Sequence, residues 1–255
     1  MLSVKWLPFR VGGFFHLPVN LMVPILKAIV PDGVEYGTAL MVEFQPDSLW
    51  YETSLTIAAQ ALRAGTKTVY HTFTRPPDEI RRILTSFGLN VTELESKGVF
   101  EVEDSYTPQT GLGSSETTAQ WAQSLKVSDW SIADAKLLKS QILDEQKRWL
   151  HIDDDTGVLL QYNPEKAIID YWRTRKGTTK VAEEVDIHPF LKGVASPAFY
   201  NQIEFLCDGI IDLKKEEKDQ EIEHYLRLRI MRGKRYDSRW HLLQLGSNGE
   251  VTIAD

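Results

Sequence analysis

The stretch ALMVEFQPDSLWYETSLTIAAQALRAG, from Ala39 to Gly65, decides how the rest of the chain is read. The apolar run over residues 38–44 predicts a buried strand, and the apolar spacing over residues 51–64 predicts a helix that ends at Gly65. A short loop joins the two. A strand, a tight loop and a helix form the frame in which many proteins hold a nucleotide phosphate at a helix N-terminus.

The loop itself lacks the residues with which proteins bind a nucleotide phosphate. A phosphate loop needs glycines that let backbone N–H groups approach the phosphate, a lysine that neutralises charge, and a Ser or Thr that holds magnesium. The corresponding positions here are Phe44, Gln45, Pro46, Asp47, Ser48, Leu49, Trp50 and Tyr51. Because phosphoryl transfer depends on positioning and charge neutralisation, we expect no ordinary Mg-ATP hydrolysis and no ATP or magnesium cofactor at this degenerate loop.

Strand-like and helix-like segments alternate after this stretch. Further strands are expected at residues 68–73, 98–102 and 149–153. Further helices are expected at residues 19–29, 77–87, 116–126, 131–147 and 164–176, the last of them ended by Gly177. Residues 178–200 carry no clear pattern. Strands that alternate with helices pair in parallel, so we expect an α/β fold with a mostly parallel sheet flanked by helices.

The last third of the chain predicts an antiparallel hairpin. Residues 209–213 and 222–231 are strand-like, and the second run alternates apolar with polar side chains. The charged run KKEEKDQE, residues 214–221, is expected to form the solvated tip. We therefore expect a single domain over residues 1–255, with an N-terminal segment at 1–24, an α/β core at 25–208 and a C-terminal hairpin and arm at 209–255.

Composition sets the class of protein. Hydrophobic residues make up 42% and charged residues 25% of the chain, which is typical of a globular, soluble protein. The net charge of −7 argues against a protein dominated by phosphate-backbone binding. One cysteine, Cys207, excludes an internal disulfide and fits a reducing, cytoplasmic setting. The uncharged run at residues 11–26 is shorter than the ~20 apolar residues of a membrane span, so no membrane partner is expected.

Several ordered segments, over roughly residues 25–255, resemble the KaiC-like branch of the RecA-type ATPases. The segments are residues 46–65, KTVYHTFTRPPDEIRRILTSFGLNVTELESKGVFEVED at 67–104, WLHIDDD at 149–155, FLCDGIIDL at 205–213 and YLRLRIMRGKRYDSRWHLLQL at 225–245. The resemblance implies a RecA-type core for the whole match. It is weakest at the phosphate loop.

The resemblance also implies which positions would serve ATP hydrolysis. The family's phosphate-binding lysine falls on Trp50 and its magnesium-binding threonine on Tyr51. Its paired catalytic glutamates fall on Thr74 and Arg75, while Asp153 keeps the aspartate of the magnesium-supporting strand. Because the lost residues all serve one reaction, the resemblance implies a non-catalytic member that acts in signalling or regulation through protein contacts.

A basic cluster near the C-terminus leaves two alternatives open. In the family, a basic pair in the Met-Arg-Gly turn reaches a neighbouring subunit's nucleotide; here Ile230 replaces the lysine and Arg232 keeps the arginine. We expect Arg232, Lys234 and Arg235 to form an interface with a protein partner or another copy. A nucleic-acid-binding accessory role is the weaker alternative, because few aromatic residues lie beside the charge. Nucleotide binding without turnover also stays open.

No metal site is expected from sequence spacing. The six histidines show no ligand pattern such as HxxxH, and His71 and His151, on expected strands, are read as core side chains. Asp153, Asp154 and Asp155 are read as a helix cap or a solvated turn. A cryptic metal-dependent enzyme site at the three aspartates is the remaining alternative, since hard cations need several converging oxygens.

Overall fold

The computed structural model describes residues 20–116, 120–132 and 148–254. The strands are β1 (Thr38–Phe44), β2 (Lys67–Thr72), β3 (Phe100–Asp104), β4 (Trp149–Asp153), β5 (Glu184–Leu191), β6 (Gly209–Lys218), β7 (Glu221–Met231), β8 (His241–Leu245) and β9 (Val251–Ile253). The α-helices are α1 (Pro24–Ile29), α2 (Trp50–Arg63), α3 (Pro77–Ser86), α4 (Val91–Ser96), α6 (Glu165–Ala182) and α7 (Pro197–Leu206). Three short 3-10 helices are η1 (Thr107–Thr110), η2 (Gln120–Gln123) and η3 (Thr156–Gln161).

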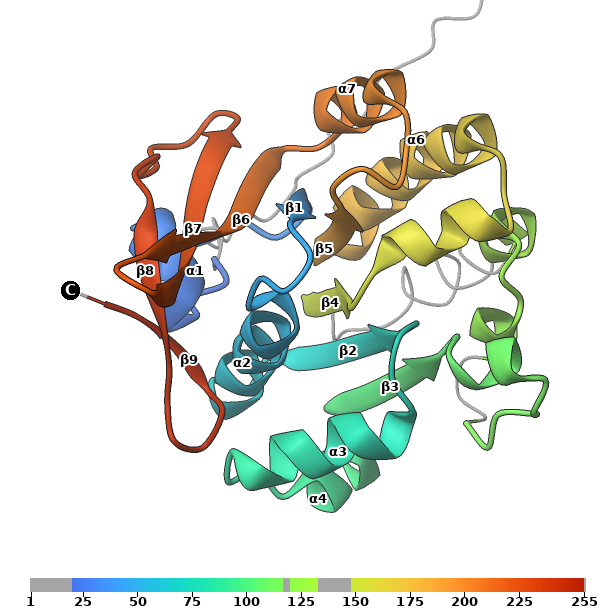
Figure 1. Ribbon diagram of the computed structural model, residues 1–255. Helices are drawn as coiled ribbons and strands as arrows, with labels where there is room; N and C mark the ends of the chain where they lie inside the picture. The colour runs from blue at the N-terminus through green and yellow to red at the C-terminus, as the bar shows by residue number, and fades with distance from the viewer. Residues whose placement is uncertain (1–19, 117–119, 133–147, 255) are drawn as a thin grey trace, which may run out of the picture.

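The strands form one nine-stranded sheet in the order β3-β2-β4-β5-β1-β6-β7-β8-β9 (Figure 1). Pairing is parallel from β3 to β6 and antiparallel from β6 to β9. The expected α/β fold, with a mostly parallel sheet and antiparallel strands at the C-terminus, is confirmed.

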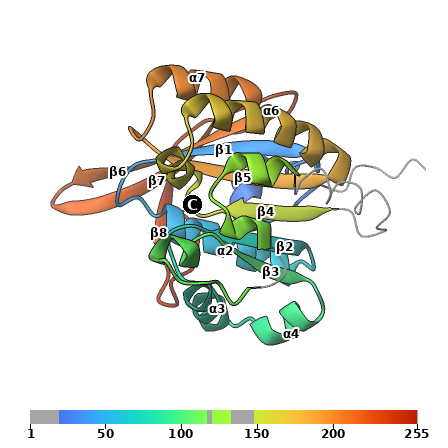
Figure 2. The same cartoon turned by 90° about the vertical axis from the view of Figure 1, so that its right-hand side faces the viewer.

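Helices cover the two faces of the parallel strands. Helices α2 and α3 lie on one face, and α6 and α7 lie on the other (Figure 2). Because side chains alternate along a strand, each strand contributes to both layers. On β4, Leu150 and Ile152 belong to the apolar core beside α2, while His151 and Asp153 point to the face of α6. No helix among the described residues is long and apolar enough to cross a membrane.

The predicted strands and helices agree best with the observed ones around residues 39–65. The strands expected at residues 38–44 and 149–153 match β1 and β4 at both ends, and β3 lies two residues later than expected. Helix α1 begins at Pro24, later than the expected residue 19. Residues 120–123 form only the short η2 within the helix expected at 116–126. Most of the helix expected at 131–147 lies outside the described residues, as do residues 1–19 of the N-terminal segment.

The prediction that Gly177 ends a helix is wrong. Helix α6 runs through Gly177 to Ala182, and its C-cap is Glu183, with a left-handed φ of 54°. A glycine inside a helix costs only about 1 kcal/mol, and the buried residues Trp172 and Thr179 continue the packed face on both sides of it. The end of α6, strand β5 and the first four residues of α7 then occupy residues 178–200, which carry no clear sequence pattern.

The expected C-terminal hairpin is present, but most of the charged run is strand rather than tip. Strand β6 extends to Lys218 and β7 begins at Glu221. Only Asp219 and Gln220 lie between them, and both have positive φ, 52° and 69°. Positive φ at both central residues is typical of the two-residue turn that follows the twist of its strands. The charges therefore lie along an exposed ribbon.

Candidate functional site

A crevice opens beside the carboxyl ends of β1, β2 and β4, and we call it the loop crevice. It is lined by Phe44, Gln45, Asp47, Ser48, Trp50, Tyr51, Thr74, Arg75, Asp154 and Asp155. The structure thus brings the degenerate loop together with Thr74 and Arg75, as the sequence placed them. Two loop residues stand outside it, since Pro46 is exposed and Leu49 packs against the core. The crevice measures about 130 Å³, less than the roughly 300 Å³ of the smallest usual ligand pockets.

Trp50 closes the crevice from the side of α2. Its side chain is only 2% exposed and lies 6.3 Å from the ring of Phe44, measured between ring centroids. The indole Nε1 donates a hydrogen bond of 2.8 Å to the backbone carbonyl of Asp154. The tryptophan therefore ties the start of α2 to the end of β4.

Asp154 is fully engaged by the chain itself. Its carboxylate accepts hydrogen bonds from the backbone N–H groups of Phe73 (2.7 Å) and Thr74 (3.0 Å), and from the hydroxyls of Thr74 (2.7 Å) and Thr72 (3.1 Å). Burial raises the pKa of Asp154, although these hydrogen bonds act in the opposite direction. The expectation of a solvated turn is wrong for this residue, which is buried and joins the ends of β2 and β4.

Acidic side chains outnumber basic ones in the described lining of the loop crevice. Its described lining carries three carboxylates, Asp47, Asp154 and Asp155, against one guanidinium, Arg75. Arg75 lies over the Tyr51 ring, 5.1 Å from its centroid. Burial raises the pKa of Asp155 to about 7, while Asp47 pairs with Lys215 at 3.0 Å. A phosphate group here would meet one basic side chain of the described lining, Arg75, beside three acidic ones.

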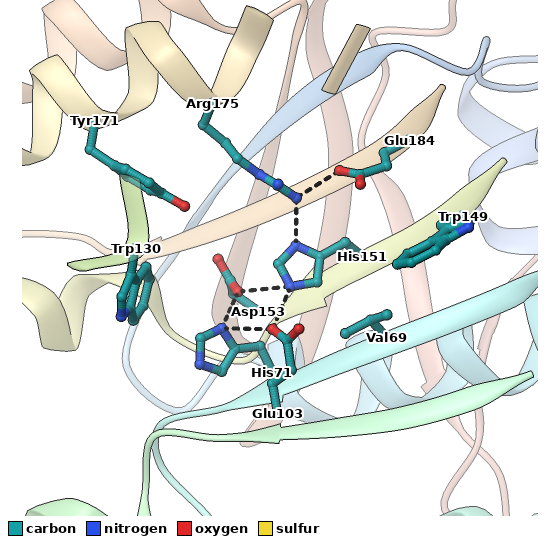
Figure 3. A pocket seen from close by; sticks show the side chains of 10 residues that line it. All are labelled: Val69, His71, Glu103, Trp130, Trp149, His151, Asp153, Tyr171, Arg175 and Glu184. Carbon is teal, nitrogen blue, oxygen red and sulfur yellow. Dashed lines mark hydrogen bonds and ion pairs between the residues drawn. The ribbon is translucent and has the colours of Figure 1, made fainter. Parts of the chain in front are cut away.

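Asp153, expected at the magnesium position, does not line the loop crevice. It points to the other face of β4, into a group of buried side chains that we call the histidine–carboxylate cluster (Figure 3). The members of the cluster are His71 of β2, Glu103 of β3, His151 and Asp153 of β4, Arg175 of α6, and Glu184, Asp186 and His188 of β5. All of them are buried.

Strand register explains how the cluster assembles. In the parallel pairing, His71 lies beside Glu103 on one side and beside Asp153 on the other. His151 lies beside Asp186 in the same way. Neighbouring positions on adjacent strands point to the same face, so residues far apart in the chain meet there.

Hydrogen bonds and ion pairs hold the outer part of the cluster. Arg175 donates to the carboxylates of Asp186 and Glu184, at 2.7 Å in each case. Asp186 also accepts from the hydroxyl of Thr179 at 2.8 Å and contacts His151 Nδ1 at 2.7 Å. These contacts fix the side chains on β5 and α6 around the two central strands.

The pKa values of the cluster follow from burial and close charges of opposite sign. Burial lowers the pKa of His151, but hydrogen bonds with the carboxylates of Asp186 and Glu103 outweigh it and raise the pKa well above its usual value. Burial raises the pKa of Asp153, but His188 and His71 outweigh it and hold the pKa below its usual range. The cluster therefore favours ionised carboxylates.

Sequence spacing did not show that these residues meet. His71 and His151 are buried, as expected of core side chains, but together with Asp153 they offer donor atoms that lie within 4.8 Å of one another. A signal was present: ionisable residues stand two apart on buried strands, in Glu101–Glu103, His151–Asp153 and Asp186–His188. Such a spacing places both side chains on one face of a strand.

The basic residues expected at an interface are partly neutralised. Lys234 pairs with Glu35 at 2.9 Å, and Arg232 donates to the carbonyl of Cys207 at 3.0 Å. Arg235 is exposed. The other arginines of this region, Arg227, Arg229 and Arg239, form ion pairs with Asp212, Glu43, Glu204 or Asp237.

A family model matches most of the chain, and two curated proteins resemble it over nearly their whole length. The profile of the KaiC ATPase family matches residues 54–255, a range that starts after the degenerate loop. A UPF0273 protein of Thermotoga maritima is 25% identical over 248 residues, covering 91% of this chain and 94% of its own. A UPF0273 protein of Aeropyrum pernix is 25% identical over 243 residues, covering 93% and 94%.

A solved structure shows the same fold. A KaiC-like protein from Pyrococcus horikoshii superposes with a TM-score of 0.67 and 17% sequence identity, over 93% of this chain and 99% of its own.

Proposed function

The chain belongs to the KaiC ATPase family, and we propose that it is a member that acts through protein contacts in signalling or regulation and does not hydrolyse ATP. The observation that carries this proposal is the closed loop crevice. Trp50 stands at the family's lysine position, and its indole is bonded to the backbone at the end of β4.

Charge supports the loss of hydrolysis. Phosphoryl transfer needs positive groups around the transferred phosphate and a metal ion beside it. The loop crevice offers one guanidinium and three carboxylates. Asp154, the carboxylate at the end of β4 that does line the crevice, already accepts four hydrogen bonds from the chain. These hydrogen bonds occupy most of the lone pairs with which the Asp154 carboxylate could bind a metal ion.

The positions that would activate water support the same conclusion. Thr74 and Arg75 stand where the family has its paired glutamates, and neither side chain can act as a carboxylate base. Thr74 is engaged with Asp154, and Arg75 lies against Tyr51 and Glu79.

The test is a direct assay of the full chain with Mg-ATP. We expect no phosphate release above the buffer rate over several hours, and no heat of binding for ATP or ADP in calorimetry. A catalytically active KaiC-family protein serves as the positive control. Heat without phosphate release would favour the alternative of nucleotide binding without turnover. Magnesium-dependent phosphate release would overturn the proposal.

A patch near Arg232 supports the protein-contact part of the proposal. Phe205, at the end of α7, is 76% exposed, and the Arg232 guanidinium lies 5.9 Å from its ring centroid. An exposed aromatic beside arginine is typical of an interface anchor. We place a protein partner or a second copy of the chain over Phe205, Arg232, Lys234 and Arg235.

Light scattering after gel filtration tests this patch. Phe205→Ser should shift an assembly to smaller species or abolish partner capture, while Leu245→Ser serves as a control at another exposed apolar residue, 53% exposed on β8. An unchanged assembly in Phe205→Ser would contradict the placement. Salt-dependent binding of single-stranded DNA, lost in Arg232→Ala and Arg235→Ala, would favour the nucleic-acid alternative instead.

A further inference from the structure

We propose that the histidine–carboxylate cluster binds a divalent transition-metal ion, with Zn²⁺ the ion that its donors fit best. The ligand atoms would be His71 Nδ1, His151 Nε2 and Asp153 Oδ1, which lie within 4.8 Å of one another, with Glu103 Oε2 beside the two imidazoles at 3.6 and 3.4 Å (Figure 3). The site is separate from the loop crevice and does not depend on the proposed function.

Hydrogen bonds on the outer side of His151 fix its tautomer. Nδ1 lies 3.3 Å from Arg175 Nη2 and only 2.7 Å from a carboxylate oxygen of Asp186, and the shorter contact is with a group that can only accept a hydrogen bond when ionised. Nδ1 therefore carries the proton, and in the neutral ring Nε2 presents a lone pair to the centre of the cluster. A carboxylate behind a histidine is the usual support of a metal-binding imidazole.

The same holds for His71. Its Nε2 lies 2.7 Å from the hydroxyl oxygen of Ser105. The Ser105 hydroxyl donates its own proton to the carbonyl of Ala122, so the histidine Nε2 is the donor in this contact. Nδ1 of the neutral ring is then the acceptor nitrogen, and it faces the centre of the cluster.

Asp153 is held in a similar way. Its Oδ2 accepts from His188 Nδ1 at 2.6 Å and from the hydroxyl of Thr156 at 3.0 Å. Its Oδ1 points toward the two central histidines. The outer contacts thus turn two imidazole nitrogens and a carboxylate oxygen inward, where they meet Glu103.

The distances between the inward-facing atoms of the cluster are longer than the hydrogen bonds on its outer side. The outer contacts measure 2.6–3.0 Å, as in good hydrogen bonds. The inner separations are 3.3 Å between His71 Nδ1 and Asp153 Oδ1, 3.6 Å between His71 Nδ1 and Glu103 Oε2, 3.4 Å between His151 Nε2 and Glu103 Oε2, and 3.8 Å between His151 Nε2 and Asp153 Oδ1. Zinc–ligand bonds of about 2.0–2.1 Å in a tetrahedron place neighbouring ligands about 3.3–3.4 Å apart.

Three of the inward atoms make no hydrogen bond of good geometry. Within the described parts of the chain, the nearest partners of Glu103 Oε2, His151 Nε2 and Asp153 Oδ1 are ion-pair contacts of 3.3–3.8 Å, although these residues are only 8%, 8% and 2% exposed. Buried polar atoms are normally satisfied, and a cation satisfies several acceptors at once. The free space among the side chains is about 20 Å³, which is room for one water molecule or one ion.

The donor set selects the class of ion. Two carboxylates and two neutral imidazoles balance the charge of one divalent cation. Two nitrogen donors disfavour Mg²⁺ and Ca²⁺, which prefer oxygen ligands, and suit Zn²⁺, which accepts both nitrogen and oxygen in tetrahedral sites. Because the three converging ligands are buried and come from β2 and β4, with Glu103 of β3 beside them, the ion would be structural.

Metal content and thermal stability of the full chain test the proposal. Purified protein should hold about one zinc ion per chain, removable with a strong chelator. Adding Zn²⁺ back at 100 times its Kd should raise the Tm by about 5–10 °C. Mg²⁺ at the same concentration should leave the Tm unchanged. Cobalt(II) in place of zinc should give the intense visible absorption of a tetrahedral site.

Matched variants locate the ion. Asp153→Asn and Glu103→Gln should each weaken zinc binding at least about 100-fold. Asp212→Asn, a change at an equally buried aspartate of β6, should leave zinc binding unchanged. Circular dichroism establishes that each variant is folded, and the two ligand variants are independent checks on each other. Zinc-free protein that does not respond to Zn²⁺, or equal zinc affinity in wild type and both ligand variants, would overturn the proposal. The cluster would then be a network of protonated histidines and carboxylates.

Discussion

Asp153 and Asp154 are neighbours in the chain, yet they belong to two sites that treat a buried carboxylate in opposite ways. In the loop crevice, Asp154 accepts four hydrogen bonds from the end of β2. In the histidine–carboxylate cluster, Asp153 uses one oxygen for His188 and Thr156 and turns the other toward acceptor atoms. The carboxylate of Asp154 is satisfied by the chain itself, whereas the inward oxygen of Asp153 lies where we propose a cation.

The largest effect that separates the two sites is expected at Trp50. Trp50→Lys removes a buried indole and buries an amine, so the free energy of unfolding should fall by about 3–5 kcal/mol in urea titration. The variant should still show no ATP turnover, because Thr74 and Arg75 supply no carboxylate. Trp50→Phe keeps an aromatic ring and should lose only about 1–2 kcal/mol with the indole hydrogen bond. Measurable turnover in Trp50→Lys would show that the crevice has kept its chemistry.

A smaller effect is expected at Asp154. Asp154→Asn replaces an acceptor oxygen with an amide that faces donors, and should lower the free energy of unfolding by about 2–3 kcal/mol. Asp47→Asn is the matched control in the same crevice, since Asp47 makes only a surface ion pair with Lys215 and should cost under about 0.5 kcal/mol. Equal losses in chemical denaturation would mean that Asp154 is not the tie between β2 and β4.

The smallest effect concerns Glu43, a buried carboxyl of β1 that belongs to neither site. Burial, followed by a hydrogen bond with Glu204, raises its pKa from 4.5 to about 7, against the positive charge of Arg229. The folded state therefore holds more protons than the unfolded chain between these two values, so this group's contribution to stability is lost as pH rises from 4.5 to about 7.

Paired unfolding curves measure that contribution. Across this window, wild type should lose about 1–2 kcal/mol more than Glu43→Gln. Parallel pH dependence in the two proteins would contradict the raised pKa of Glu43.

Much of the fold could be predicted from the sequence, because apolar runs and turn residues are local signals. The β1–α2–β2–α3 succession was read within a few residues of its bounds. Strand β5 was missed, since Glu184, Asp186 and His188 interrupt its apolar pattern although all three are buried. Their charges are paired with Arg175 and other cluster members, and those partners come from other elements.

The loop crevice could be predicted from the sequence, whereas the histidine–carboxylate cluster could not. The loop crevice is built mainly from a continuous stretch, so the prediction that Trp50 stands at the family's lysine position could be made from the sequence alone. The histidine–carboxylate cluster depends on strand register, which brings His71 beside Glu103 and Asp153. Only its spacing of two residues along buried strands was visible, and that spacing does not say which strands are neighbours.

One thermal-shift experiment on the full chain compares the two sites most directly. The protein is stripped with a chelator and then melted alone, with Mg-ATP, and with Zn²⁺, each ligand at millimolar or saturating concentration. We predict no change in Tm with Mg-ATP and a rise of about 5–10 °C with Zn²⁺. A rise with Mg-ATP would contradict the closed loop crevice, and no rise with Zn²⁺ would contradict the metal site.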